Sequence, residues 1–126
     1  MILSHVSIGS NDLVRARVLY DPLMQLLGLR VLNASEKGID YGANETVFSI
    51  EKPVDGKPAS AGNGVHIAFA AEDRGVVRKF HETGLANGAT DEGKPGLRPE
   101  YDANYYGAFI RDADGNKIEA VTFSAD

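Results

Sequence analysis

Two histidines and one glutamate are the residues of this chain whose types and positions could support metal chemistry. His5 and His66 each lie in a stretch where apolar and polar residues alternate, and both fall on the face opposite the apolar side chains. Glu119 lies within the apolar run 117–123, where a buried carboxylate needs a cation or a polar partner. Two histidines and one carboxylate facing a shared cavity form a ligand set that iron, manganese, zinc, nickel or cobalt favours when coordination positions stay open.

The same three residues also allow a purely structural interpretation. The two histidines could be partly buried side chains that bond backbone carbonyls, and Glu119 could form an ion pair with a nearby base, either Arg98, Arg111 or Lys117. Spacing alone does not decide between the two interpretations. The third histidine, His81, lies beside Glu82 without an obvious partner, and we expect it at the surface.

A second group of residues could contact a substrate. The segment 90–104 and the residue after it are rich in glycine, proline and charge and contain Arg98, Tyr101 and Tyr105. A guanidinium makes forked bonds to anions, and a phenol donates or accepts a proton, so the group suits an anionic or phenolic substrate. Tyrosines at the start of a hairpin also commonly serve packing, and Arg98 could simply tether its loop. No catalytic residue is predicted.

The elements that position these residues follow from apolar periodicity. A strand is predicted over 2–9, and after it a helix that Ser10-Asn11-Asp12 can cap and that ends near Gly28, with a kink or restart at Pro22. Three short strands follow, and then a proline- and glycine-rich linker over 53–63; the predicted strands are 29–35, 37–42 and 45–51.

The second half of the chain repeats this order. A shift of 61 residues places His5 on His66 and Asp12 on Asp73, so strand 64–71 and a helix ending at Asn87-Gly88 match the first strand and helix. Strands are predicted at 105–111 and 116–123, and the segment 90–104 is predicted as a long loop. The expected fold class is α+β, with two copies of a strand, helix and strand-rich unit around a shared cavity.

Composition excludes several classes of protein. With 126 residues the chain forms one domain, and its 43% hydrophobic residues are typical of a folded protein. The formal net charge of -5, without a basic run, argues against nucleic acid as a partner. We expect a cytoplasmic protein that does not bind membranes, because there is no long apolar run and no signal peptide pattern. The absence of cysteine excludes disulfides and thiolate metal sites.

The sequence resembles the vicinal oxygen chelate superfamily, which includes glyoxalase I, bleomycin-resistance proteins and extradiol dioxygenases. The resemblance is carried by the opening His5-Val-Ser-Ile-Gly, the restart Val65-His-Ile-Ala-Phe69, and above all the ending Phe109-Ile-Arg-Asp-Ala-Asp-Gly-Asn-Lys-Ile-Glu119. It implies one glyoxalase-like domain over 1–126, in which two βαβββ modules, 1–52 and 64–126, form a half-barrel around a shared cavity. It also implies a divalent metal at their junction, held by His5, His66 and Glu119, and a homodimer.

One position departs from the glyoxalase I pattern. A fourth ligand, a glutamate, is expected on the last strand of the first module, where this chain has Ser49. Serine is a weak ligand, and Glu51 would need a register shift to replace it. The reaction type stays open among lyase or isomerase, extradiol cleavage and thiol addition. The alternative function is metal-free binding or sequestration of a small molecule, as in bleomycin-resistance proteins.

Overall fold

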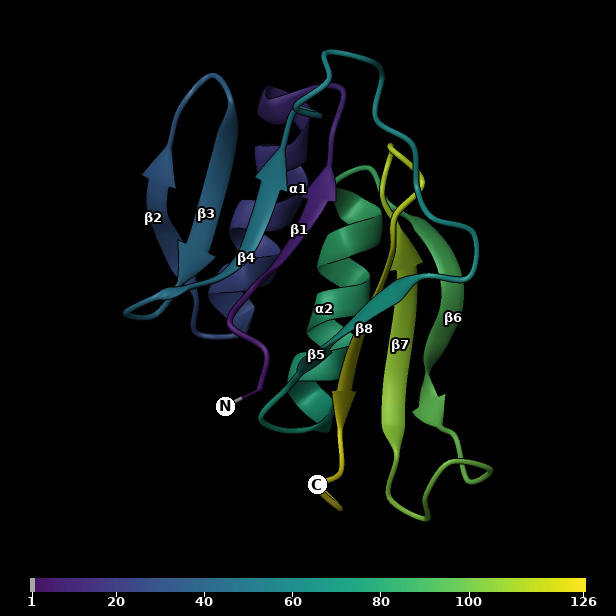
Figure 1. The fold of residues 1–126 in the computed structure, drawn as a ribbon. Helices are drawn as coiled ribbons and strands as arrows, with labels where there is room; N and C mark the ends of the chain where they lie inside the picture. The colour runs from purple at the N-terminus through teal and green to yellow at the C-terminus, as the bar shows by residue number, and fades with distance from the viewer. Residues whose placement is uncertain (1) are drawn as a thin grey trace.

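The computed structural model describes residues 2–126, which form two modules of one helix and a four-stranded sheet each (Figure 1). Module 1 holds helix α1 and a sheet of strand order β1-β4-β3-β2, in which β1 and β4 are parallel and the other pairs antiparallel. Its elements are β1 (Val6–Gly9), α1 (Leu13–Leu26), β2 (Arg30–Ala34), β3 (Gly38–Gly42) and β4 (Thr46–Glu51).

Module 2 has the same topology, with the strand order β5-β8-β7-β6 and a parallel pair of β5 with β8. Its elements are β5 (His66–Ala70), α2 (Arg74–Ala86), β6 (Thr90–Leu97), β7 (Tyr106–Arg111) and β8 (Lys117–Thr122). The predicted α+β class and the repeated module are therefore confirmed. No helix or strand lies between Glu51 and His66, as the linker prediction requires.

Equivalent aspartates begin the two helices. The Asp12 carboxylate accepts a hydrogen bond from the Arg15 amide at 3.0 Å, and Asp73 accepts one from the Val76 amide at 2.9 Å. Such caps satisfy amides that have no partner in the first helical turn. Helix α1 runs without a break from Leu13 to Leu26, so a restart at Pro22 is wrong; Leu23 and Met24, fully buried after the proline, hold the last turns against the core.

One hydrophobic core joins the modules. Helices α1 and α2 pack against each other, and the Phe48 ring of β4 meets the Phe69 ring of β5 edge to face at 5.1 Å between centroids. Three apolar residues of the first strands pack against this core, namely Ile8, Ile67 and Phe69. Val65 does not, because it precedes β5 and is 62% exposed.

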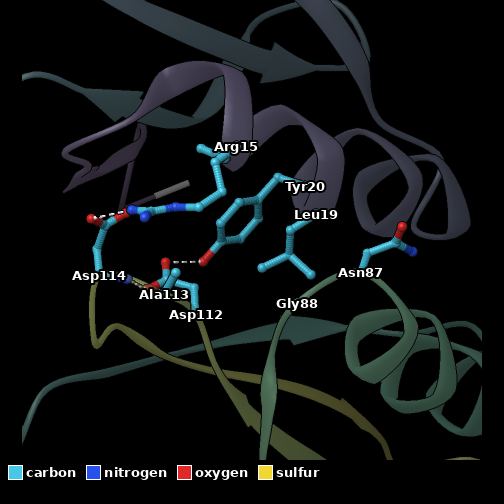
Figure 2. Close-up of a pocket in the computed structure, with 9 residues that line it drawn as sticks. Arg15, Leu19, Tyr20, Asn87, Gly88, Asp112, Ala113 and Asp114 are labelled. Carbon is cyan, nitrogen blue, oxygen red and sulfur yellow. Dashed lines mark hydrogen bonds and ion pairs between the residues drawn. The ribbon is translucent and has the colours of Figure 1, made fainter.

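A turn between β7 and β8 fastens module 2 to module 1 (Figure 2). The Asp114 carboxylate accepts hydrogen bonds from Ser10 Oγ at 2.8 Å and from the Asn11 amide at 3.0 Å, and it pairs with Arg15 at 2.9 Å. The buried Tyr20 hydroxyl donates to Asp112 at 2.6 Å. Arg15, Tyr20, Asp112 and Asp114 help to line a hollow of about 40 Å³ that is too small for a substrate. The turn is a structural connection.

The prediction of a long loop over 90–104 in module 2 needs correction. The segment 90–104 is not all loop, because residues 90–97 form the edge strand β6. The register of β6 shifts between Asp91 and Gly93 and again before Gly96, which explains the weak strand pattern.

Within residues 2–126, no helix is long and apolar enough to cross a membrane.

Candidate functional site

Glu119 lies at the centre of the module 2 sheet and is fully buried. Its Oε2 accepts a hydrogen bond from the Tyr105 hydroxyl at 2.6 Å, and its Oε1 lies 3.1 Å from His66 Nε2. A Cβ atom at Gly107 would lie 2.8 Å from Glu119 Oε2, so the glycine leaves the space that this carboxylate occupies. Both carboxylate oxygens are therefore held in fixed positions by neighbouring strands and by the loop before β7.

Tyr105 and His66 approach Glu119 from opposite sides. Burial, together with the hydrogen bond to Glu119, raises the pKa of the Tyr105 hydroxyl above its ordinary value, so that this phenol is a neutral donor at physiological pH. His66 begins β5, and its side chain is 43% exposed, whereas Glu119 is 0% exposed. The imidazole therefore connects a buried carboxylate with the surface, and the Phe109 ring lies beside it at 5.7 Å between centroids.

The other predicted ligands lie in module 1, and the structure does not bring them to Glu119. His5 precedes β1 and is exposed, with its Nδ1 3.0 Å from Ser4 Oγ. Ser49 is buried in β4, and its hydroxyl donates to Asp40 Oδ1 at 2.7 Å. A hollow of about 460 Å³ lies beside this pair, lined in part by Asn33, Asp40 and Glu51.

Strand register shows that Ser49 and Glu119 are equivalent positions. Ser49 pairs with Ser7, two residues after His5, and Glu119 pairs with Ala68, two residues after His66. Each module thus has one histidine at or just before its first strand and one central position on the strand that pairs with it in parallel. The carboxylate is present in module 2 only.

The predicted substrate residues surround the Glu119 side of module 2. Tyr105 contacts Glu119 directly, and the Tyr101 ring lies 5.0 Å from the Tyr105 ring. Arg98 donates to the carbonyls of Gly96 and Lys94, both at 2.8 Å, so its guanidinium fork holds β6 and the following loop together. All three residues therefore belong to one region, in which Arg98 contributes mainly structure and positive charge.

His81 is buried, contrary to the expectation of a surface position. It lies on α2, and its Nε2 is 2.8 Å from Asp91 Oδ1 on β6. The hydrogen bond with His81 is the main cause that lowers the pKa of the Asp91 carboxyl. This pair could not be predicted from the residue pattern, because Asp91 lies in the segment that is predicted as a loop.

The sequence profile of the Glyoxalase/Bleomycin resistance protein/Dioxygenase superfamily matches residues 2–120. The chain belongs to this superfamily. It is similar to a glyoxalase/bleomycin resistance protein from Albidiferax ferrireducens T118, with 38% sequence identity and a TM-score of 0.86 over 97% of this chain and 98% of that chain. No protein with a curated description matches the chain.

Other superfamily structures share the fold at lower identity. A lactoylglutathione lyase from Agrobacterium tumefaciens is 18% identical, with a TM-score of 0.65 over 97% of this chain and 92% of that chain. A glyoxalase/bleomycin resistance protein/dioxygenase family enzyme from Burkholderia phytofirmans PsJN is also 18% identical, with a TM-score of 0.72 over 96% of this chain and 98% of that chain. These likenesses support the glyoxalase-like fold, whereas function must be argued from the site.

His66 and Glu119 fit a divalent ion as a pair of donors. An imidazole nitrogen and a carboxylate oxygen suit the transition metals, and the Tyr105 hydroxyl holds the second carboxylate oxygen in the way that outer partners orient metal ligands. Within residues 2–126, no three histidine, aspartate or glutamate side chains come close enough to hold one ion. One copy of this chain therefore brings together two of the three predicted ligands, His66 and Glu119.

Proposed function

We propose that this superfamily member is a divalent-metal-dependent enzyme that acts on a small molecule with two neighbouring oxygens. The observation that carries the proposal is the contact between His66 Nε2 and the fully buried Glu119 carboxylate. The ion would be Fe, Mn, Ni, Co or Zn, and bound at these residues it would supply Lewis-acid polarisation of substrate oxygens. The reaction would be of the lyase or dioxygenase type.

The protein's own residues have distinct tasks in this proposal. Glu119 and His66 hold the ion, and Tyr105 keeps Glu119 oriented through its 2.6 Å hydrogen bond. Tyr101 offers an exposed ring beside Tyr105 against which the substrate packs. Arg98 fixes the loop that carries both tyrosines and adds positive charge near an anionic substrate.

The third ligand would come from a second copy of the chain. His5 lies in module 1, and its register equivalence to His66 makes it the natural partner from another subunit. We therefore propose a homodimer in which the site combines module 1 of one copy with module 2 of the other. A dimer with isologous contacts would form two such sites.

Metal-free binding of a small molecule is the second candidate, and one observation favours it. Both Glu119 oxygens already have protein partners, and no buried side-chain polar atom within residues 2–126 is left without one. The carboxylate is therefore satisfied without an ion. In this case the same face would sequester its ligand through Tyr101, Tyr105 and Arg98.

Metal titration decides between the two candidates. Stripped protein without a His tag is titrated with Mn²⁺, Fe²⁺, Co²⁺, Ni²⁺ and Zn²⁺ by calorimetry, beside His66→Ala and Glu119→Gln. The enzyme proposal expects one ion per chain, lost in both variants and kept in Glu82→Gln, a control at an exposed glutamate of α2. If no ion binds tightly to the wild-type protein, the metal proposal is wrong and sequestration remains.

A mixing experiment tests the shared site. His5→Ala and His66→Ala each lack one histidine, so neither homodimer holds an ion tightly. Unfolding and refolding the two together produces heterodimers, in which one of two sites has both histidines. Tight binding that reappears only in the mixture supports the homodimer, and binding that stays absent in the mixture contradicts it.

A further inference from the structure

A row of three basic side chains crosses the module 2 sheet next to Glu119. Lys117 on β8 lies directly opposite His66 on β5 and Arg111 on β7, so all three share one face. Arg111 pairs with Glu92, and His66 pairs with Glu119. Lys117 forms no ion pair and no side-chain hydrogen bond within residues 2–126. Its charge is therefore the one in this row that no acid offsets.

The ring of Phe109 lies between two cations on this face. Lys117 Nζ is 5.0 Å and Arg98 Cζ is 5.7 Å from the Phe109 ring centroid. The Arg98 guanidinium is bonded to backbone carbonyls, so its charge is not cancelled by a carboxylate. The chain carries a net charge of -5, yet neither Lys117 nor Arg98 forms an ion pair with a carboxylate within residues 2–126. Like charges on adjacent strands are destabilising, and a bound anion would relieve their repulsion.

An aromatic surface adjoins the cations. The Tyr105 ring, whose hydroxyl bonds Glu119, lies 5.0 Å from the Tyr101 ring and 5.3 Å from the Phe123 ring. Tyr101 is 66% and Phe123 is 58% exposed, so the ring edges and faces are available to a ligand. Aromatic side chains favour offset or edge-to-face contacts with a further ring.

We propose that Lys117 binds the oxyanion group of the ligand and that the ligand is a small molecule with an aryl group beside that oxyanion. The aryl group packs on Tyr101, Tyr105 and Phe123, and the oxyanion, a carboxylate or a phosphate, meets the Lys117 ammonium beside Phe109. The inference rests on the proposed ligand-binding role of this face and names the chemical class of ligand. In this inference Lys117 contacts the anion in place of Arg98, because the Arg98 guanidinium already donates to backbone carbonyls.

The test compares charged and neutral probes on stripped protein by NMR titration. Benzoate, phenyl phosphate and the neutral isostere benzamide are titrated into the wild type, Lys117→Met, Lys117→Arg and Lys79→Met, the last a control at an exposed lysine of α2. We expect at least a tenfold preference of the wild type for one of the anions over benzamide. Lys117→Met should lose the preference, whereas Lys117→Arg and Lys79→Met should keep it.

The outcomes separate this inference from the proposed metal dependence. Selective anion binding in a protein that binds no metal supports this inference and shows that the proposed metal dependence is wrong. Equal binding of benzoate, phenyl phosphate and benzamide, or a preference that survives in Lys117→Met, overturns the inference whether or not metal binds. Whichever of benzoate and phenyl phosphate binds more tightly identifies the oxyanion as carboxylate or phosphate. A circular dichroism spectrum matching the wild type confirms that Lys117→Met is folded.

Discussion

Ser49 and Glu119 occupy equivalent central positions in the two sheets, but one side chain is a neutral hydroxyl and the other a carboxylate. In module 1 a serine hydroxyl donates to Asp40 from the neighbouring strand. In module 2 a fully buried carboxylate bonds His66 and Tyr105. The two modules share one scaffold, with equivalent histidines and equivalent helix caps, while a carboxylate occupies the central strand position in module 2 only. Fold symmetry therefore does not imply a symmetric site.

Alanine at each central position measures this asymmetry directly. Glu119→Ala leaves His66 and Tyr105 without their partner and opens a cavity, so we expect the free energy of unfolding to fall by about 3 kcal/mol. Ser49→Ala removes one hydrogen bond to Asp40 and should cost about 1 kcal/mol. Urea unfolding of both variants gives the comparison. Equal losses would mean that the two positions carry similar energetic weight, against the argument above.

Two glycines at equivalent register extend the comparison. Gly107 pairs with Val121 and Gly38 with Glu51, in each case two residues beyond the central position. Gly107→Ala should cost about 2 kcal/mol, because the new Cβ would displace the buried Glu119 carboxylate, and it should shift the NMR signals of the His66 ring. Gly38→Ala crowds the Ile50 carbonyl instead and should leave those signals unchanged. A His66 shift in Gly38→Ala would show that the modules are coupled.

Much of this organisation could be predicted from residue patterns. The helices, their caps and the 61-residue repeat depend on local periodicity and on short-range bonds, which is why a cap within Ser10-Asn11-Asp12 and one at the equivalent Asp73 could be predicted. Strand β6 was missed because Gly93, Pro95 and Gly96 interrupt the alternation that marks a strand. The burial of His81 was missed for the same reason, since its partner Asp91 lies on that strand.

The site was predictable in its residue types and not in its contacts. Glu119 in an apolar run indicated a buried carboxylate, but of the three bases considered as partners none forms an ion pair or a hydrogen bond with it within residues 2–126. The actual partners, His66 and Tyr105, lie 53 and 14 residues away. The metal-ligand role of His5, His66 and Glu119 and the substrate role of Arg98, Tyr101 and Tyr105 stay predictions, which the titrations above test.

The Tyr105 hydroxyl gives a smaller test of the module 2 site. Tyr105→Phe removes the donor to Glu119 Oε2 and leaves a buried acceptor with one partner fewer, so we expect a loss of about 1.5 kcal/mol in stability. Tyr101→Phe is the matched control, because the Tyr101 hydroxyl makes no side-chain hydrogen bond within residues 2–126, and it should change stability little. Thermal unfolding of both variants checks this. Similar melting temperatures for the two would contradict an orienting role for Tyr105.

The smallest expected effect on stability concerns the β7–β8 turn, which joins the modules and carries Asp114, rather than the central positions of the two sheets. Desolvation of Asp114 acts against ionisation, but hydrogen bonds from Asn11 and Ser10 and the charge of Arg15 outweigh it and lower the Asp114 pKa. Because the folded-state pKa lies below the unfolded value of 3.8, the stabilisation is complete above that pH and is lost as the pH falls through the folded-state pKa.

Asp114→Asn should therefore reduce stability by about 1 kcal/mol at pH 7, with a deficit that disappears below the folded-state pKa. Urea unfolding from pH 7 down to pH 2 measures the difference, with Glu72→Gln as a control at an exposed carboxylate. A deficit that is constant over this range would attribute the loss to packing of the amide and not to the lost charge. Because the turn fixes module 1 to module 2 within one chain, an unchanged metal affinity in Asp114→Asn would further separate this structural carboxylate from Glu119.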